Sequence, residues 1–423
     1  MTEWIGAAEA AERLGIKQAS LYAYVSRGVL SRRRDADGRA SKFDAEEVAQ
    51  LARRGRPRRG AAGAELVIES ELTEITSTTQ RYRGHDATAL ALRCSFQDVA
   101  MLLWTGALPG SDAARAAGVA RQSDAGCRSR WSATPAALAA GRAAQAALPP
   151  GTLPLERIQV IVPALAVTDP FRLHLDRPAV VAAGMSLIAG MTDALPLAGA
   201  ADSAGDAIAA RLAARLCRAP ASPGLIRVLS AALVLVADHE LAASTLAARV
   251  AASMRADPYA VVSTGLGAMT GALHGGAALG AEIMLGSADS PADAPRVVGD
   301  VLRRGERLPG FGHFVYRDGD PRANLLLRLI AQYAPDSERL AIASAVTVEA
   351  RSRALPDPNI EFALAVLVGV AGMIRGAGEA MFAIGRTAGW LAHALEEYER
   401  NIPIRPRCVY TGPVAVTEYA GES

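Results

Sequence analysis

Cysteine and aromatic residues are scarce in this chain. The 423 residues include 4 cysteines, with no CxxC pair and no zinc-type spacing: Cys94, Cys127, Cys217 and Cys408. This pattern predicts reduced thiols in a cytoplasmic protein without a metal site. Aromatic residues make up 5% and hydrophobic residues 51% of the chain. The core must therefore consist largely of Ala, Leu and Val, whose small side chains favour closely packed helices and a mainly α fold.

A clear membrane segment is also lacking. The N-terminus has no apolar stretch of the kind found in signal peptides, so we expect none. The longest uncharged run, 258–281, has the length of a membrane span, but six glycines and His274 interrupt it. We therefore interpret it as a buried segment and expect no membrane partner.

Net charge is small but unevenly distributed. The whole chain carries +2, whereas residues 1–60 alone hold 13 Lys or Arg and 8 Asp or Glu. A basic head on a slightly acidic body suggests that the head alone binds an anionic polymer.

Residues 4–54 have the pattern of a small separate module. Ala7, Ala8, Ala11 and Leu14 predict one helix with an apolar face, and Gly15 can end it. A second helix is expected over 19–27, and an Asp37-Gly38 turn predicts a hairpin after Arg32–Arg34. Asp44 and Glu47 have capping-box spacing for a third helix that ends at Arg54.

This succession resembles the winged helix-turn-helix head of MerR-type and excisionase-type DNA-binding proteins. The resemblance implies that residues near the second helix face the major groove and that residues of the wing contact phosphates. The first set is Gln18, Ser20, Tyr22 and Tyr24; the second is Arg32, Arg34, Arg39 and Lys42. The alternative is that the basic face is merely solvated or docks on the rest of the chain. Residues 1–56 form the predicted module and 57–64 its linker.

From Glu65 onward the pattern changes. Alternating β-branched residues over 66–75 predict two short strands, and a Tyr82-Arg83-Gly84-His85 turn follows. The run from Phe96 predicts a helix that stops near Gly106 and Pro109.

Two histidine motifs lie farther along the chain, Leu273-His274-Gly275-Gly276 and the run Pro309-Gly310-Phe311-Gly312-His313. The second continues to Arg317 and to Asp320-Pro321-Arg322. Together with the 65–109 pattern, they resemble the citrate synthase family over 65–423. The resemblance implies a large helical domain (65–276 and 372–423), a small helical domain (277–371) and a cleft between them.

The resemblance gives three histidines a role. His274 would donate to the thioester oxygen as an enol forms, and His313 would donate to the ketone of a 2-oxo acid. His239, in Ala237-Asp238-His239-Glu240, matches a histidine that binds the oxo acid. His85, His174 and His393 are interpreted as structural.

Arginine suits carboxylates because its planar fork binds both oxygens and stays charged. By resemblance, Arg322, Arg386 and Arg405 clamp the oxo-acid carboxylates, and Arg317 contacts a coenzyme A phosphate. The family takes its last arginine from a neighbouring subunit, so a homodimer with shared active sites is expected.

The base departs from the family pattern. Where the family has Pro-Asn-Val-Asp, this chain has Pro358-Asn359-Ile360-Glu361. Glu361 keeps a carboxylate but adds a methylene, a displacement that can cost on the order of a hundredfold in rate.

The leading hypothesis is a condensation of acetyl-CoA with oxaloacetate that gives citrate and CoA, with no permanently bound cofactor and no metal. A 2-methylcitrate synthase using propionyl-CoA is an alternative, because one methylene is worth only about 1–3 kcal/mol. A ligand-sensing DNA-binding regulator with weak or no turnover is a third.

Overall fold

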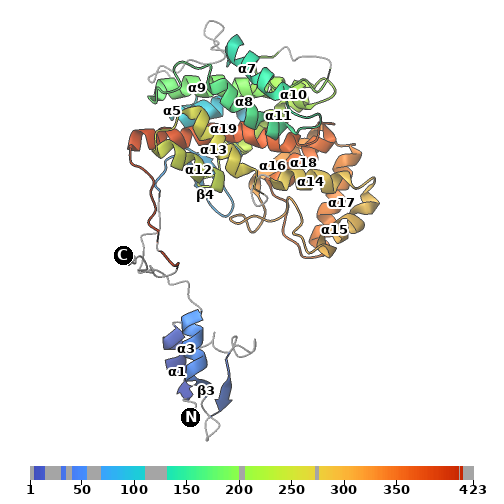
Figure 1. The fold of residues 1–423 in the computed structure, drawn as a ribbon. Helices are drawn as coiled ribbons and strands as arrows, with labels where there is room; N and C mark the ends of the chain where they lie inside the picture. Colours follow the sequence, from blue (N-terminus) through green and yellow to red (C-terminus); the bar gives the residue numbers. More distant parts are fainter. Residues whose placement is uncertain are drawn as a thin grey trace, which may run out of the picture. The chain divides into compact units, whose positions relative to one another are not determined.

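The computed structural model describes residues 4–14, 30–34, 41–54, 68–109, 131–199, 205–271, 276–408 and 410–412. Its internal contacts divide the chain into two units, Met1–Glu69 and Ser70–Ser423. The first is a small mixed α/β unit, and the second is a mainly helical body (Figure 1).

The N-terminal unit is a three-stranded antiparallel sheet with two helices. Its elements are β1 (Trp4–Gly6), α1 (Ala7–Leu14), β2 (Arg32–Arg34), β3 (Ser41–Asp44) and α3 (Ala45–Arg54). The strand order is β1-β3-β2, with Trp4 opposite Asp44 and Arg34 opposite Ser41. Phe43 and Val48 are fully buried in its core. The predicted first helix, third helix and strand pairing are thereby confirmed.

Two local details of the prediction were wrong. Ala8 is exposed, and Ala10 is buried in its place, because positions 7, 10, 11 and 14 share one helical face. Asp44 accepts hydrogen bonds from the backbone N–H groups of Glu46 (2.9 Å) and Glu47 (3.3 Å) at the start of α3. The Glu47 carboxylate accepts instead from the Ser31 hydroxyl at 2.9 Å, so only half of the capping box forms.

The winged helix-turn-helix itself stays a prediction. Its expected second helix and hairpin turn lie outside the described residues, as do Gln18, Ser20, Tyr22, Tyr24 and Arg39. Within the described part, Arg32 is exposed on β2, Arg34 ends that strand, and Lys42 is half-buried on β3.

The body is built from a small sheet and a series of helices. In chain order they are β4 (Thr73–Ile75), β5 (Gln80–Tyr82), β6 (His85–Asp86), α4 (Ala87–Arg93), α5 (Phe96–Thr105), α7 (Pro135–Ala146), α8 (Pro154–Ala166), α9 (Arg177–Asp193), α10 (Ile208–Leu216), α11 (Pro223–Leu235), α12 (Ala243–Ser253), α13 (Pro258–Met269), α14 (Gly276–Gly286), the 3-10 helix η1 (Pro291–Asp293), α15 (Ala294–Arg303), α16 (Pro321–Tyr333), α17 (Glu338–Ser352), α18 (Ile360–Val370) and α19 (Ala377–Arg400).

Local sequence explains where many of these helices begin. Several start with a Thr, Asp or Ser whose side chain accepts a backbone N–H of the first turn, followed by proline at the first or second helical position. The capping residues are Thr134, Asp176, Ser222, Asp257 and Asp320. The predicted helix from Phe96 is confirmed as α5, which ends at Gly106 in the left-handed conformation (φ +80°).

The strand prediction for 66–75 was only partly right. Within the described residues of that stretch only Thr73–Ile75 forms a strand. Its partner β5 comes from Gln80–Tyr82, after a turn closed by a 2.9 Å hydrogen bond from Thr76 N–H to the Thr79 carbonyl. The sheet order is β4-β5-β6.

Helix α19 is the centre of the body. Figure 1 shows it running across the middle, with α8, α9 and α10 on one side and α14 to α18 gathered toward its beginning. Two glycines let α19 approach the end of α11 closely. A Cβ at Gly385 would lie 2.6 Å from a Val236 methyl group, and one at Gly389 would collide with the Ala237 carbonyl. This close approach places the middle of α19 beside the segment that carries His239.

The uncharged run 258–281 forms α13 and the start of α14. No helix among the residues described above is long and apolar enough to cross a membrane. The division of the body into large and small domains stays a prediction, because the contacts place Ser70–Ser423 in one unit.

Candidate active site

One cavity in the body collects five of the side chains that the sequence singled out. Its volume is about 470 Å³, and its walls are formed by His239, Glu240, Leu241, Ala242, Ala243, His313, Phe314, Val315, Arg322, Glu361, Phe382 and Arg386. They come from the segment after α11, the loop before α16, the first turns of α16 and α18, and the middle of α19. Residues up to 147 positions apart in the chain, His239 and Arg386, therefore meet in one place.

The loop that carries His313 depends on two glycines in left-handed backbone conformations. Gly310 has φ of +78° and Gly312 has φ of +79°. A Cβ at Gly310 would lie 2.8 Å from the Cβ of Phe362, too close for any side chain. Glycine is required there both by backbone conformation and by space.

The same loop is hydrogen-bonded to the segment that precedes α18. Gly312 N–H donates to the Asp357 carbonyl at 2.8 Å, and Asn359 N–H donates to the Gly310 carbonyl at 2.8 Å. The Asn359 side-chain amide donates to the Gly312 carbonyl at 2.9 Å. The loop of His313 and the start of the helix that carries Glu361 are thus held together by three hydrogen bonds.

His313 is held as a neutral imidazole with its proton on Nε2. Its Nδ1 accepts the backbone N–H groups of Val315 (3.0 Å) and Tyr316 (3.2 Å), so Nδ1 carries no proton. Burial, together with the positive charge of Arg322, lowers the pKa of His313 to about 4. At neutral pH this residue offers an Nε2–H donor to the cavity.

Arg322 is fixed by a two-point contact with Asp320. Its Nε and Nη2 donate to the two carboxylate oxygens at 3.0 and 2.8 Å, and both side chains are buried. Asp320 also accepts the backbone N–H of Ile360 at 3.1 Å, at the start of α18. Burial alone would raise the pKa of Asp320, but Arg322 brings it below the usual value. Asp320 therefore orients a cation of the cavity and connects α16 to α18.

Glu361 lies in the first turn of α18. Asn359 begins this helix, and its side-chain oxygen accepts the N–H groups of Glu361 (3.1 Å) and Phe362 (3.3 Å). Burial raises the pKa of Glu361 above the ordinary value, while Arg322 and Arg386 act in the opposite direction. The carboxylate is consequently a stronger base than one in water.

His239 lies across from His313. The two ring centroids are 5.1 Å apart, with their planes at 72°. Burial lowers the pKa of His239 well below its ordinary value, and the positive charges of Arg322 and Arg386 add to this effect. Its Nε2 is buried and has no hydrogen-bond partner among the described residues. A buried polar atom on a cavity wall is suited to a ligand.

A buried chain of side chains supports the segment of His239. Asp238, directly before it, accepts hydrogen bonds from the Thr73 hydroxyl (2.5 Å) and from His393 Nε2 (3.3 Å). His393 Nδ1 faces Arg249 Nη1 at 2.6 Å and must be the acceptor, because a guanidinium only donates. His393 thus connects Asp238 to Arg249.

Arg386 contributes a second cation, from α19. It is 1% exposed, its Nε donates to the Val236 carbonyl at 2.7 Å, and its guanidinium lies 4.6 Å from the centre of the Phe382 ring. Its Nη1 is buried without a hydrogen-bond partner in the described part of the chain. Part of the Arg386 guanidinium is thus available to bind an anion in the cavity.

Two predicted site residues do not line this cavity, and a third is not described. Arg317 and Arg405 are exposed and do not line it. His274 lies outside the described residues. Within those residues, no group of three or more His, Cys, Asp or Glu side chains could hold a metal ion.

Sequence reasoning missed the residues that support the site. Asp238 and Asp320 stand inside the quoted motifs, next to predicted residues, but received no role of their own. His393 was interpreted as structural, and it is fully buried. The signal for it was its position seven residues after Arg386, two turns along the same face of α19.

Residues 62–407 match the protein-family model "Citrate synthase, C-terminal domain". Citrate synthase 2 of Bacillus subtilis is 32% identical over 370 residues, 84% of this chain and 96% of that relative. The 2-methylcitrate synthase of Mycobacterium tuberculosis is 29% identical over 374 residues, 84% of this chain and 90% of that relative. A putative citrate synthase 2 from the same species is 42% identical over 197 residues. This last match covers 45% of this chain and 52% of that relative, so the chain spans about half its length.

Solved structures show the same fold. Citrate synthase from Thermotoga maritima has a TM-score of 0.66 at 25% identity, covering 85% of this chain and 97% of that one. Thermoplasma acidophilum citrate synthase, solved as a ternary complex with carboxymethyl coenzyme A and oxaloacetate, has a TM-score of 0.69 at 24% identity. It covers 85% of this chain and 98% of its own. The mainly helical fold predicted from sequence is confirmed for the body.

Proposed function

Because the chain belongs to the citrate synthase family, we propose that it condenses acetyl-CoA with oxaloacetate to give citrate and free CoA. The observation that carries this proposal is the single cavity shared by His239, His313, Arg322, Arg386 and Glu361. It combines two neutral imidazoles, two buried cations and a carboxylate of raised pKa.

The cations and imidazoles suit a 2-oxo acid. The carboxylates of oxaloacetate bind Arg386 and Arg322, whose guanidinium groups Val236 and Asp320 hold in place. The Nε2–H of His313 donates to the ketone oxygen and makes its carbon more electrophilic. His239, whose Nε2 has no hydrogen-bond partner among the described residues, hydrogen-bonds the same substrate.

Glu361 is the proposed base. Its carboxylate takes a proton from the methyl group of acetyl-CoA, and the electron pair of that C–H bond forms the enol as His274 is proposed to donate a proton to the thioester oxygen. The enol carbon then bonds to the ketone carbon of oxaloacetate, and the ketone oxygen takes up a proton from His313. Water cleaves the thioester of the citryl-CoA product, so that citrate and CoA leave. Burial supports this role, because a carboxylate of raised pKa holds a proton more strongly.

A 2-methylcitrate synthase that uses propionyl-CoA is the second candidate. The observation that favours it is the apolar part of the cavity wall, formed by Leu241, Ala242, Val315 and Phe382. The additional methyl group of propionyl-CoA fits such a surface. An apolar pocket distinguishes two substrates that differ by one methylene by only about 1–3 kcal/mol.

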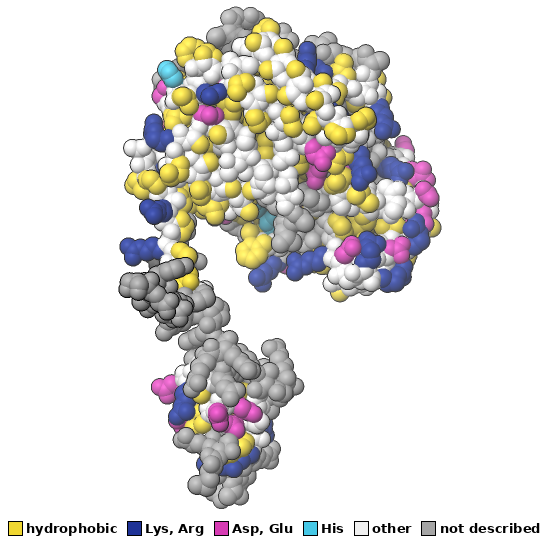
Figure 2. Space-filling view, viewed as in Figure 1, with side chains coloured by type: hydrophobic (Ala, Val, Ile, Leu, Met, Phe, Trp, Pro, Cys, Tyr) yellow, Lys and Arg dark blue, Asp and Glu magenta, His cyan; other side chains and the backbone are white. Residues whose placement is uncertain are grey.

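The family pattern of Arg405 supports a homodimer with shared sites. This residue is exposed on the segment after α19, where Ile404 N–H donates to the Ser253 hydroxyl at 3.0 Å. We propose that Arg405 completes the cavity of a second copy. Figure 2 shows hydrophobic side chains over much of the face on which α12 and α13 lie. Exposed apolar residues of the body include Val167, Phe171, Leu173, Met254 and Ile402.

The N-terminal unit is proposed to bind DNA through its basic strand. Arg32 and Arg33 are exposed on β2, and the Arg33 guanidinium lies 4.4 Å from the centre of the Trp4 ring. A regulator that senses a ligand through the body, with little or no turnover, is the alternative to a working enzyme. DNA affinity that falls steeply with added salt and is lost without residues 1–56 would support it.

The test of the main proposal is CoA release, followed with a thiol reagent after mixing the full chain with oxaloacetate and acetyl-CoA. Propionyl-CoA in place of acetyl-CoA separates the two enzymatic candidates by their kcat/KM. Glu361→Asp reports on the base position, since it restores the acid found in the family. Absence of CoA release with either thioester, in protein that still binds oxaloacetate, would contradict the enzyme and favour the regulator.

A further inference from the structure

A second pocket lies in the body, on residues that the proposed function does not use. Its volume is about 310 Å³. It is bordered by the end of α10, by α14, α17 and α18, and by the segment between α18 and α19. None of its lining residues lines the candidate active site.

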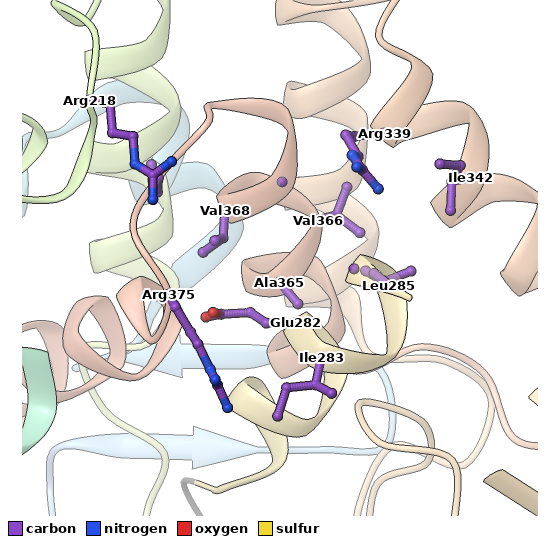
Figure 3. A pocket seen from close by; sticks show the side chains of 13 residues that line it. Arg218, Glu282, Ile283, Leu285, Arg339, Ile342, Ala365, Val366, Val368 and Arg375 are labelled. Carbon is purple, nitrogen blue, oxygen red and sulfur yellow. The ribbon is translucent and has the colours of Figure 1, made fainter. Parts of the chain in front are cut away.

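The wall of this pocket is apolar. Leu285 on α14, Ile342 on α17, and Ala365 and Val366 on α18 contribute aliphatic side chains, and Met373 lies beyond the end of α18. Figure 3 shows the first four of these side chains among the arginines that surround the pocket. Such a surface suits an apolar body of modest size.

Three arginines stand around this apolar surface. Arg218 follows α10, Arg339 lies on α17, and Arg375 precedes α19, so the cations come from three separate segments (Figure 3). All three are exposed, and none has a salt bridge to a residue that the structure describes. Arg339 donates to the Ala288 carbonyl at 2.9 Å, which holds its side chain at the pocket.

Glu282 offsets only part of this positive charge, through an electrostatic interaction with Arg375. It is the one carboxylate among the described lining residues, and its two oxygens accept the backbone N–H groups of Gly376 (2.8 Å) and Gly378 (3.0 Å). Burial raises the pKa of this carboxyl group. Three guanidinium groups are thereby left facing an apolar pocket that holds at most one negative charge.

We propose that this pocket is a second ligand site, which binds an organic anion with a compact apolar body. The carboxylate or phosphate of the ligand pairs with Arg218, Arg339 and Arg375, and its apolar part contacts α14 and α18. Helix α18 begins with Ile360-Glu361 and ends at the pocket, and the Glu282 contacts secure the start of α19, which carries Arg386. A ligand here therefore contacts or adjoins α18 and α19, two of the helices that supply the candidate active site, and it acts as an effector of turnover.

The binding test uses octanoate and the full chain in isothermal titration calorimetry. The uncharged probe is 1-octanol, which has an alkyl chain of similar size. Octanoate should bind saturably at one site per chain. The Arg218→Gln/Arg375→Gln double variant should weaken it at least about tenfold, because charge-assisted hydrogen bonds are lost. Octanol should bind at least about tenfold more weakly than octanoate, for the same reason.

Two variants locate the site. Gly369→Met places an apolar side chain in the pocket without removing any arginine, and its Cβ would meet Arg339 only at an ordinary 3.7 Å. It should abolish octanoate binding. Arg386→Gln alters the candidate active site, and Arg227→Gln alters an exposed arginine of a different pocket; both should leave binding unchanged. Loss of binding in Arg386→Gln but not in the double variant, or no saturable binding to the wild type, would overturn the proposal.

The effector role rests on the proposed function, whereas binding does not. In the CoA-release assay, saturating octanoate should change the KM or kcat of the wild type and have no effect on Gly369→Met. Saturable binding with unchanged kinetic constants in an active enzyme would overturn the effector role alone. An inactive enzyme that binds octanoate as described would contradict the proposed function and leave the second site standing.

Discussion

The arginines of the two cavities in the body differ in burial and in ion pairing. In the candidate active site, Arg322 and Arg386 are almost completely buried, and Asp320 and the Val236 carbonyl fix them. Around the second pocket, the arginines are exposed and have no salt bridges within the described chain. Fixed charges favour chemistry, because a transition state gains most from groups that need not reorganise. Exposed, unpaired charges favour reversible binding and contribute little to stability.

The largest effect should come from removing the base of the fixed cavity. Glu361→Gln should lower kcat by about 10²–10⁴-fold, the usual contribution of a positioned base, with oxaloacetate affinity changed only slightly. CoA release and a separate oxaloacetate titration measure the two quantities. A variant that kept more than a tenth of the wild-type kcat would exclude Glu361 as the base.

Next in size is the loss of the carboxylate that fixes Arg322. Asp320→Asn leaves a buried guanidinium without its counter-charge and should lower the free energy of unfolding by about 3–5 kcal/mol. Urea denaturation measures it. The matched control is Asp357→Asn. The Asp357 carboxylate pairs with the exposed Arg351 at 3.2 Å, so this variant should lower the free energy of unfolding by at most about 1 kcal/mol. Equal losses in the two variants would remove the distinction between buried and surface pairs.

The third largest effect should come from replacing Gly310, in the loop that carries His313. Gly310→Ala forces a side chain into the left-handed region, at about 1–2 kcal/mol, and also against Phe362. Gly305→Ala is its control, because Gly305 has φ of +72° and a Cβ added there would have nothing within 4 Å. Only the first should also lower kcat. A similar loss of stability in both would mean that the contact with Phe362 relaxes at no cost.

The raised pKa of Glu361 gives a pH dependence of opposite sign for activity and stability. Activity requires the ionised form, so kcat/KM should rise with pH through the raised pKa. Stability changes the other way: the unfolded chain ionises this group at a lower pH, so its burial costs stability as pH rises toward the folded-state pKa. Glu361→Gln should therefore raise the urea midpoint at pH 8 relative to wild type, and not at pH 4. A lower midpoint for this variant at pH 8 would contradict burial as the cause.

The smallest effect should be that of the exposed arginines. Without octanoate, Arg218→Gln/Arg375→Gln should change stability by no more than about 0.5 kcal/mol and leave kcat unchanged. Arg386→Gln should lower kcat/KM strongly under the same conditions. If the double variant lost activity to a similar extent, the two cavities would differ less than their burial indicates.

The candidate site could be predicted largely because its residues stand in compact motifs. His313, Arg322 and Glu361 are each flanked by Gly, Pro or Asn that set the local backbone, and the cavity collects all three. The supporting contacts could not be predicted in this way. His393 meets Asp238 across 155 residues and Arg249 across 144, and no local pattern encodes contacts over such separations. The second pocket is equally invisible in sequence, because an arginine on a helix surface looks the same whether or not an apolar pocket lies beside it.

The three hydrogen bonds between the His313 loop and the Asp357–Asn359 segment make one module out of two stretches about 45 residues apart. An engineer who wishes to change the acyl donor by transplanting sequence from a relative must exchange both stretches together. Replacing either stretch alone would combine the His313 loop of one protein with the Glu361 segment of another. The position of the Glu361 carboxylate relative to the His313 imidazole is therefore kept only when both stretches are transferred together.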